Sequence, residues 1–280
     1  MNLKSHVDSP RILVTAIHGP YEPWISILRN GQIPTWMKQN GKVRVVNVFG
    51  RSVADRYLPV DQKLYFLRWN ESRIIAYFSL LIEAVIKKFL MVNRYQPKIK
   101  LKVDDTFGEV WEVQQPDSLL LQGVKNIATL RESLNHEFDF LITTITSTYL
   151  NLDQISNTLH ESSRVQFIGG RIESSGGKKF QQGSFRVYSR DVVEYIVKNS
   201  KKYKHWQIED IAMGNVVAAK YRDFTEMPNL TIRCPEDLES IDPQSMIEVC
   251  SFRCKSQSED GVRADALIMK LISARLRETS

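Results

Sequence analysis

Short apolar runs alternate along the chain with longer stretches in which apolar residues recur at helical spacing. The short, β-branched runs are typical of buried strands, and the longer periodic stretches are typical of amphipathic helices. Strands are predicted at residues 11–17, 43–49, 109–113, 138–144 and 165–168. Helices are predicted at residues 23–30 (a helix or a turn), 74–92, 119–134, 152–159, 190–199 and 264–276. This alternation predicts an α/β fold with a mostly parallel central sheet and helices on both faces.

The most apolar stretch, residues 74–92, carries the charged residues Glu83, Lys87 and Lys88. Charges at the centre of a bilayer are costly, so the stretch does not predict a membrane-spanning helix. We interpret it as a helix of the protein core. Contact with a membrane surface or with a partner protein is the alternative interpretation.

The N-terminal apolar run, residues 12–17, is too short for a signal peptide or a membrane anchor. We therefore expect a soluble, cytoplasmic protein, with attachment to the membrane periphery left open. The three cysteines, Cys234, Cys250 and Cys254, match neither a disulfide framework nor a zinc ribbon in number and spacing. They favour a reducing compartment.

The 280 residues carry a formal net charge of +6, and the chain is long enough to bury one large core. The charge suits an anionic partner, whether a nucleotide, an acidic glycan, an anionic lipid or nucleic acid. The chain has no RNP motif, Cys/His finger or long Lys/Arg block, so we expect no nucleic-acid partner. A Walker loop, a Gly-x-Gly-x-x-Gly motif and a Ser-His-Asp signature are also absent from the sequence.

The stretches that follow the predicted strands are 15–19, 49–51, 114–118 and 144–148. Ligands of open α/β sheets bind beyond the carboxyl ends of the strands. We therefore expect these stretches to converge on one site, together with a later acidic residue, Asp210. The polar stretch 169–184 is expected to form a mobile loop over the same edge. Asp104 and Asp105 precede a predicted strand and indicate a turn rather than a metal site.

The most specific feature of the chain is an ordered pair of segments, Gly183-Ser-Phe-Arg-Val-Tyr-Ser-Arg-Asp191 and Ile208-Glu-Asp-Ile-Ala-Met-Gly214. Together they resemble the β-1,3-galactosyltransferase and Fringe group of glycosyltransferases. In that group a Gly/Ser-rich acceptor loop leads into a strand that ends in Ser-Arg-Asp or a close variant. A helix follows, and then an acidic pair with a glycine.

Other segments similar to that group occur in the same order over residues 11–272. They are Gly31-Gln-Ile-Pro-Thr-Trp36, Pro116-Asp-Ser118 with Lys125, Asp139-Phe-Leu-Ile-Thr-Thr144, and Tyr149-Leu-Asn-Leu152. Where the group has its Asp-Asp-Asp metal motif, this chain has Ile145-Thr-Ser147. A hydroxyl does not replace a carboxylate as a strong ligand of a hard cation. No metal ligand is therefore assigned, and the use of a divalent metal stays open.

The resemblance implies a GT-A-like single domain at residues 1–235, with residues 236–280 as a C-terminal segment and helix packed on it. It implies an inverting enzyme that transfers a hexose or N-acetylhexosamine from a UDP-sugar to a glycan acceptor, with surface polysaccharide synthesis as the expected process. The alternative is a non-catalytic relative that binds a nucleotide or a glycan. The lost acidic motif favours this alternative, and the retained Glu209-Asp210 pair opposes it. A basic nucleic-acid-binding protein is a third hypothesis, supported by charge alone.

Inversion at the anomeric carbon requires a carboxylate that takes the proton from the attacking hydroxyl. The resemblance implies that Asp210 is this base and that Glu209 orients the acceptor or caps the following helix. The alternative is an ordinary helix N-terminus, whose carboxylates offset the helix dipole. Gly183 and Ser184 are expected to bind the acceptor. The residues expected to bind the donor are Thr15, His18, Lys125, Ser147, Arg253 and Lys255, with Arg263 as a further cation. A structural histidine and solvated surface cations are the alternatives for this set.

Overall fold

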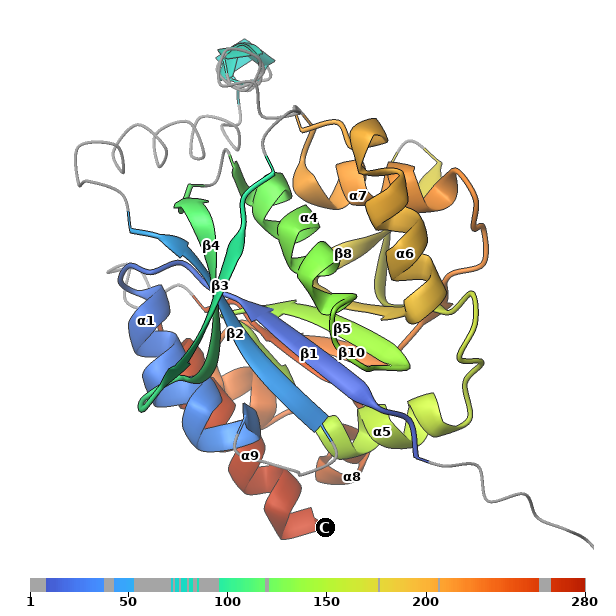
Figure 1. Cartoon of the computed structure of the whole chain (residues 1–280). Coiled ribbons are helices and arrows are strands. Elements are labelled where there is room, and N and C mark those ends of the chain that lie inside the picture. Colours follow the sequence, from blue (N-terminus) through green and yellow to red (C-terminus); the bar gives the residue numbers. More distant parts are fainter. Residues whose placement is uncertain are drawn as a thin grey trace, which may run out of the picture.

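The computed structural model describes residues 9–37, 43–52, 96–118, 121–175, 177–205, 207–256 and 263–279. It also describes residues 72, 74, 75, 77–79, 81, 82 and 85. Figure 1 shows a central twisted sheet with helices on both of its faces.

The sheet has eight strands in the order β3-β4-β2-β1-β5-β8-β7-β9. The strands are β1 (Ile12–Ile17), β2 (Val43–Arg51), β3 (Ile99–Asp104), β4 (Gly108–Pro116), β5 (Phe140–Ile145), β7 (Ile168–Ser175), β8 (Lys178–Ser189) and β9 (Thr225–Glu226). The neighbouring pairs β4–β2, β2–β1, β1–β5 and β7–β9 are parallel, whereas β3–β4, β5–β8 and β7–β8 are antiparallel. The predicted α/β fold with a mostly parallel sheet is confirmed.

The central strand β1 is buried along its whole length. Ile12, Val14 and Ala16 belong to the hydrophobic cluster on one face of the sheet, and Leu13 and Ile17 belong to the cluster on the other face. Successive side chains of a strand point to opposite faces, so a strand covered on both sides is apolar throughout. This is why the first apolar run of the sequence is continuous rather than alternating.

Helices cover the two faces of the sheet in separate groups. One face carries α4 (Gln122–Ser133), α6 (Arg190–Lys198) and α7 (Glu209–Ala218), whose apolar residues join the cluster of Leu13. The other carries α1 (Trp24–Ile27), the π-helix η1 (Leu28–Met37), α5 (Leu152–His160), α8 (Pro243–Ile247) and α9 (Asp265–Thr279). Two short 3₁₀ helices, η4 (Ser200–Lys202) and η5 (Pro235–Leu238), complete the described helices.

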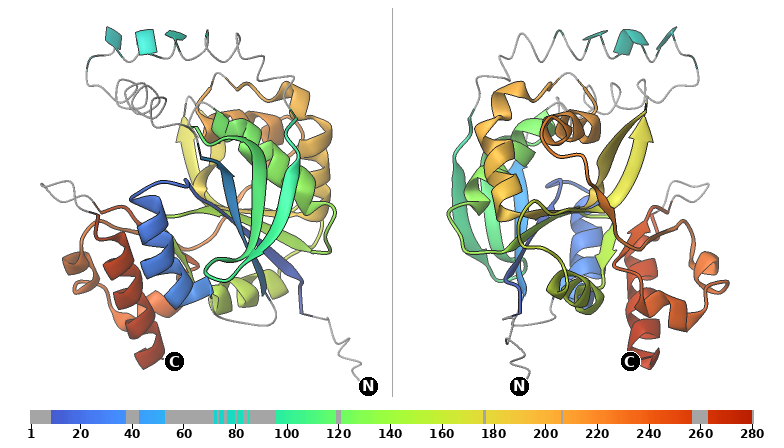
Figure 2. Two further views of the ribbon diagram at one scale, coloured as in Figure 1. Left: turned by 60° about the vertical axis from the view of Figure 1, so that its left-hand side comes forward. Right: turned by 90° about the vertical axis from the view of Figure 1, so that its right-hand side faces the viewer.

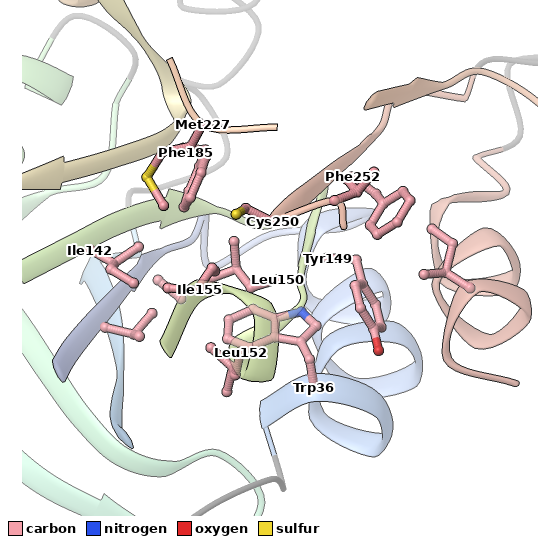
Figure 3. Close-up of a cluster of buried hydrophobic side chains, with 14 of the residues drawn as sticks. Trp36, Ile142, Tyr149, Leu150, Leu152, Ile155, Phe185, Met227, Cys250 and Phe252 are labelled. Carbon is pink, nitrogen blue, oxygen red and sulfur yellow. The ribbon is translucent and has the colours of Figure 1, made fainter. Parts of the chain in front are cut away.

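The hydrophobic cluster that contains Ile12, Val14 and Ala16 joins the C-terminal elements to the rest of the fold. Figure 3 shows Trp36, Tyr149 and Phe252 beside side chains from the sheet and from α5. Ile268 and Ile272 of α9 are fully buried in the same cluster. Burying an aliphatic side chain of this size contributes about 1.5–3 kcal/mol. The C-terminal segment therefore packs against the same core as β1.

A second, three-stranded sheet contains residues that the sequence pattern did not assign to strands. It has the order β10-β11-β6, with β6 (Thr148–Leu150), β10 (Asn229–Ile232) and β11 (Ser251–Cys254). Strand β11 runs antiparallel to β6, so that Arg253 lies opposite Thr148. This pairing brings a segment of the C-terminal region to the end of β5.

Two predictions about the stretch before α6 are wrong. The predicted strand at 165–168 begins at Ile168, where it was expected to end, and residues 169–184 form most of the β7–β8 hairpin instead of a mobile loop. Buried Gln181 supports the hairpin by donating from Nε2 to the carbonyl oxygens of Gly169 and Val187. The backbone of this stretch is satisfied by pairing between β7 and β8, and residues 185–189 of β8 anchor the hairpin on distant β5, a contact that the local composition does not reveal. Edge strand β3 was also missed, although Ile99, Leu101 and Val103 alternate with polar residues.

Most of the predicted helix at 74–92 lies outside the described residues. Its described residues are helical, but Ile74, Phe78 and Val85 are 69%, 59% and 67% exposed. The prediction of a core helix is therefore wrong for these positions. Figure 2 shows the described pieces, in teal, set apart from the sheet and its covering helices. Within the described part of the chain, no helix has the length and apolar character needed to cross a membrane.

Candidate functional site

His18 joins the carboxyl ends of three parallel strands. Its backbone N–H donates to Val48 O (2.9 Å), Nδ1 lies 2.9 Å from Thr146 Oγ1, and Nε2 lies 2.8 Å from Asn47 Oδ1. The ring is 1% exposed. Burial, with a smaller contribution from the nearby Lys125 charge, lowers the pKa of His18 to about 3. The imidazole is therefore neutral and fully engaged, which supports the structural alternative over a direct donor contact.

Lys125 of α4 is the second connection at this edge. Its Nζ donates to Asp117 Oδ2 (2.9 Å), Asp117 Oδ1 (3.0 Å) and the His18 carbonyl (3.0 Å). Asp117 in turn accepts from Gly50 N–H at 2.9 Å. The Lys125 and Asp117 side chains are 3% and 10% exposed. The charge of Lys125 is thus already paired, and the structure does not present it as a free cation for a diphosphate.

The turn at residues 145–147, which replaces the acidic motif, is held by its main chain. Gln32 of η1 donates from Nε2 to Ile145 O (3.1 Å) and Thr148 O (2.9 Å). Trp36 Nε1 also donates to Thr148 O, at 3.2 Å, and Cys254 N–H donates to Ser147 O, at 2.9 Å. The turn has no carboxylate, and these carbonyls are engaged, so it does not fit a divalent cation. In the described residues, no three His, Cys, Asp or Glu side chains gather as a metal site.

A buried guanidinium holds the acidic pair at the start of α7. Arg186 of β8 is 3% exposed and binds Glu209 through Nη1–Oε1 (2.8 Å) and Nη2–Oε2 (2.5 Å). Its Nη2 also lies 2.5 Å from Asp210 Oδ1, which accepts from Gly183 N–H at 3.0 Å. The N-cap residue of α7 is Ile208, and no side chain caps the helix. The carboxylates of Glu209 and Asp210 instead contact residues of β8. Sequence reasoning missed Arg186, although an arginine among apolar strand residues was a signal.

The two carboxyl groups of this cluster titrate differently. Burial, together with the adjacent Glu209 charge, raises the pKa of Asp210 to about 7, against the lowering effect of Arg186. The pKa of Glu209 is lowered: burial acts in the other direction, but the charge and hydrogen bonds of Arg186 outweigh it. Asp210 keeps 27% of its side chain exposed. A partly exposed carboxylate that titrates near neutrality is suited to accept a proton from a ligand.

Two glycines, one in each of the segments 183–191 and 208–214, allow α7 to approach β8. A Cβ at Gly183 would lie 2.8 Å from Asp210 Oδ1, and a Cβ at Gly214 would lie 2.4 Å from Phe180 Cβ. Neither distance leaves room for a side chain. The glycines are therefore explained by packing that places Asp210 beside the strand.

Arg253 of β11 lies next to the turn at residues 145–147. Arg253 is opposite Thr148, and the N–H of its neighbour Cys254 donates to the carbonyl oxygen of Ser147. Its Nη1 is buried without a hydrogen-bond partner among the described residues. Burial lowers the pKa of Arg253, Asp265 opposes this effect and Arg263 adds to it. Arg263 is itself bound to Asp265 and lies 4.9 Å from the ring centroid of Trp24. A buried unpaired donor is costly, and an anion would satisfy it.

The other predicted site residues are placed as follows. Thr15 is fully buried within the sheet and donates its hydroxyl to Ile142 O at 3.3 Å, so it does not reach the edge. Ser184 is buried, and its hydroxyl donates to Gln182 Oε1 at 2.8 Å. Ser147 is 3% exposed, whereas Lys255 is exposed beside β11. Among these residues, Lys255 alone offers an exposed charge.

The stretches expected to converge do so. A chain of hydrogen bonds runs from Asp117 to Lys125, from Lys125 to His18, and from His18 to Thr146. Two residues before Thr146, Thr144 Oγ1 donates to Ser184 O at 2.8 Å, and adjacent Gly183 binds Asp210. Asp210 and the 145–147 turn therefore share one edge of the sheet, as the positions of the strand ends predicted.

No protein-family model matches this chain, and no curated protein matches it either. Among solved structures, it is similar to the glycosyltransferase GlyE of Streptococcus pneumoniae TIGR4, with a TM-score of 0.43 and 9% sequence identity. The match covers 97% of this chain and 63% of that protein.

Proposed function

We propose that this chain is an inverting glycosyltransferase that transfers a hexose or an N-acetylhexosamine from a UDP-sugar to a glycan acceptor. Its proposed process is surface polysaccharide synthesis in the cytoplasm. One observation carries the proposal: the edge of the sheet at the 145–147 turn holds both Asp210, a carboxylate whose pKa burial raises to about 7, and Arg253, a guanidinium with an unpartnered buried nitrogen. The transfer requires a base beside the acceptor hydroxyl and an anion-binding group beside the leaving diphosphate. The resemblance of residues 183–214 to glycosyltransferases supports the same conclusion.

In the proposed reaction, Asp210 takes the proton from the acceptor hydroxyl as the oxygen attacks the anomeric carbon. The bond from that carbon to the diphosphate breaks, and its electron pair leaves with UDP. Arg253 stabilises the developing negative charge, a role that preorganised cations fill in other transfers of charged groups. Gly183 holds Asp210 through its backbone N–H, and we assign Gly183 and Ser184 to the acceptor side. We assign no part in this mechanism to the turn at residues 145–147.

Activity is expected to rise with pH through about 7. A base works in its deprotonated form, and the raised pKa of Asp210 keeps it protonated at lower pH. Below about pH 7, kcat/KM should fall about tenfold for each pH unit, and above it the profile should level off. Initial rates of sugar transfer in a constant-ionic-strength buffer series measure this profile. A flat profile across neutrality would contradict the assignment of Asp210 as the base.

Donor binding is expected to depend on Arg253 more than on a divalent metal. Loss of a charged partner commonly costs about 2–5 kcal/mol, so Arg253→Ala should weaken UDP binding by roughly thirty-fold or more. Calorimetric titrations with UDP, with and without EDTA, provide the measurement. Lys255→Ala tests the exposed neighbour, and Arg222→Ala, at an exposed cation on another segment, is the control. Binding that EDTA abolishes and Arg253→Ala leaves unchanged would point to a metal held by other carboxylates.

The loss of the acidic motif supports a second candidate, a non-catalytic protein that binds a nucleotide or a glycan. A panel of UDP-sugars, screened by thermal stability and then by transfer and hydrolysis assays, separates the two. A donor at about a hundred times its dissociation constant should stabilise the fold by about 2.7 kcal/mol. Stabilisation with turnover supports the enzyme, and stabilisation without turnover of any donor and acceptor pair supports the binding protein. Absence of stabilisation by every UDP-sugar would argue against the enzyme and favour a non-catalytic protein that binds a glycan.

A further inference from the structure

The described helical residues between positions 74 and 85 present an apolar face to solvent. This apolar face consists of Ile74, Ile75, Tyr77, Phe78, Leu81, Ile82 and Val85, which are 41–69% exposed. At 100° per residue, all seven positions fall within an arc of about 160° around the helix. Ser79, outside that arc, is 3% exposed. The helix thus turns its apolar side outward, the reverse of a surface helix that packs on a core.

Such a surface is unfavourable in water. Burying a side chain the size of Ile or Phe is among the largest single gains available to a folded chain. Contiguous exposed apolar patches therefore mark a binding surface for a protein or a membrane. Nothing in the described part of the chain covers these seven side chains.

The charge around the apolar face selects the partner. Residues 61–102 contain nine Lys and Arg against three Asp and Glu, a net charge of +6. The other 238 residues contain 29 of each, so this segment accounts for the whole net charge of the chain. A second copy of the chain would bring two such segments together and oppose its own binding. An anionic surface would instead be attracted.

Exposed lysines continue the positive charge from the helix to the sheet. Lys98 precedes edge strand β3, and Lys100 lies within it, and both are exposed. β3 begins on the side of the molecule where the described helical pieces lie (Figures 1 and 2). The aromatic side chains of Tyr77 and Phe78 are both exposed on the apolar face itself. Apolar and aromatic residues beside lysines are the composition of helices that lie in the plane of a bilayer interface.

We propose that the apolar face at residues 74–85 binds the surface of a bilayer that contains anionic lipid. The helix lies in the interface with its apolar residues among the acyl chains, and the exposed Lys98 and Lys100 contact the headgroups. The stretch carries Glu83, Lys87 and Lys88, charges that are costly at the centre of a bilayer, so the proposed contact is peripheral. The proposal does not depend on the sugar-transfer chemistry, since it rests on a different part of the molecule.

Cosedimentation of the full chain with vesicles tests the proposal. Vesicles of phosphatidylcholine alone are compared with vesicles that also contain phosphatidylglycerol. Binding is expected to be stronger to the anionic vesicles and to weaken as salt is raised, because basic segments bind anionic surfaces through screened charges. No binding to either vesicle, or equal binding to both at every salt concentration, would overturn the proposal. This arm uses the unaltered protein and is independent of how any variant folds.

A pair of matched double variants locates the contact. Phe78→Glu with Ile82→Glu places two charges on the apolar face, and Leu267→Glu with Leu271→Glu does the same, at the same spacing, on exposed positions of α9. The first variant should lose at least about tenfold in vesicle affinity, and the second should bind like the parent. Equal losses in both variants would overturn the location. A dimer in size-exclusion chromatography that the first variant abolishes would assign the face to a second copy and also overturn the proposal.

Discussion

Asp210→Asn is expected to lower the turnover of sugar transfer by about two to four orders of magnitude, the range for loss of a general base. The amide keeps the size and hydrogen-bonding capacity of the side chain but cannot take a proton at neutral pH. Gly183 N–H, which donates to Asp210 Oδ1 at 3.0 Å, still has an oxygen to bind. Fold and donor affinity should therefore stay close to the parent values. Steady-state rates, thermal melting and UDP titration measure the three properties on one preparation.

The control for this variant is an acidic residue in the first turn of another helix. Asp153 occupies that place in α5 and is exposed. Asp153→Asn removes a dipole-offsetting charge, worth a few tenths to about 1 kcal/mol, and should leave turnover unchanged. If Asp210→Asn transfers sugar at near the parent rate, both aspartates have the same role. Asp210 would then be an ordinary carboxylate of a helix N-terminus.

Arg186→Met is expected to destabilise the fold by about 3–5 kcal/mol at neutral pH, since breaking a buried ion pair leaves uncompensated charge. Arg186 is 3% exposed and contacts both Glu209 and Asp210 at 2.5 Å. Urea denaturation of parent and variant at pH 7 measures the difference. Arg44→Met is the control, because the Arg44 and Glu109 side chains are 44% and 27% exposed and such pairs contribute about 0–1 kcal/mol. Equal losses in the two variants would mean that the Arg186 cluster is no more than a surface ion pair.

The pH dependence of this loss follows from the direction of the Glu209 shift. Its pKa is lowered in the folded protein, so its contribution to stability is present above the unfolded pKa and is lost as pH falls. The variant lacks this contribution at neutral pH. The difference between parent and variant should therefore shrink as the pH is lowered through the range in which the carboxyl groups protonate. A difference that stays constant down to acid pH would assign the effect to packing of the arginine stem.

Much of the central architecture could be predicted from local patterns. Strands β1, β2, β4 and β5 and helices α4, α5, α6 and α9 coincide closely with the predicted segments. Their side chains repeat with the period of the element and are buried between layers, so each short window of sequence carries its own signal. The convergence of the strand ends also followed, because parallel strands direct their carboxyl ends to one edge. The acidic pair at 209–210 was located by its motif.

Other properties were decided by contacts between residues distant in sequence. The hairpin of β7 and β8 and the small sheet of β6, β10 and β11 depend on backbone pairing with remote partners, which composition does not encode. The tertiary structure likewise pairs Lys125 with Asp117, fully engages His18 and leaves Arg253 Nη1 without a partner. It also turns the seven residues of the apolar face outward. The sequence by itself determined the elements and the edge where they meet. What each charged side chain does there was decided by its neighbours, because burial and pairing set the free energy of a charge and both arise from the assembled fold.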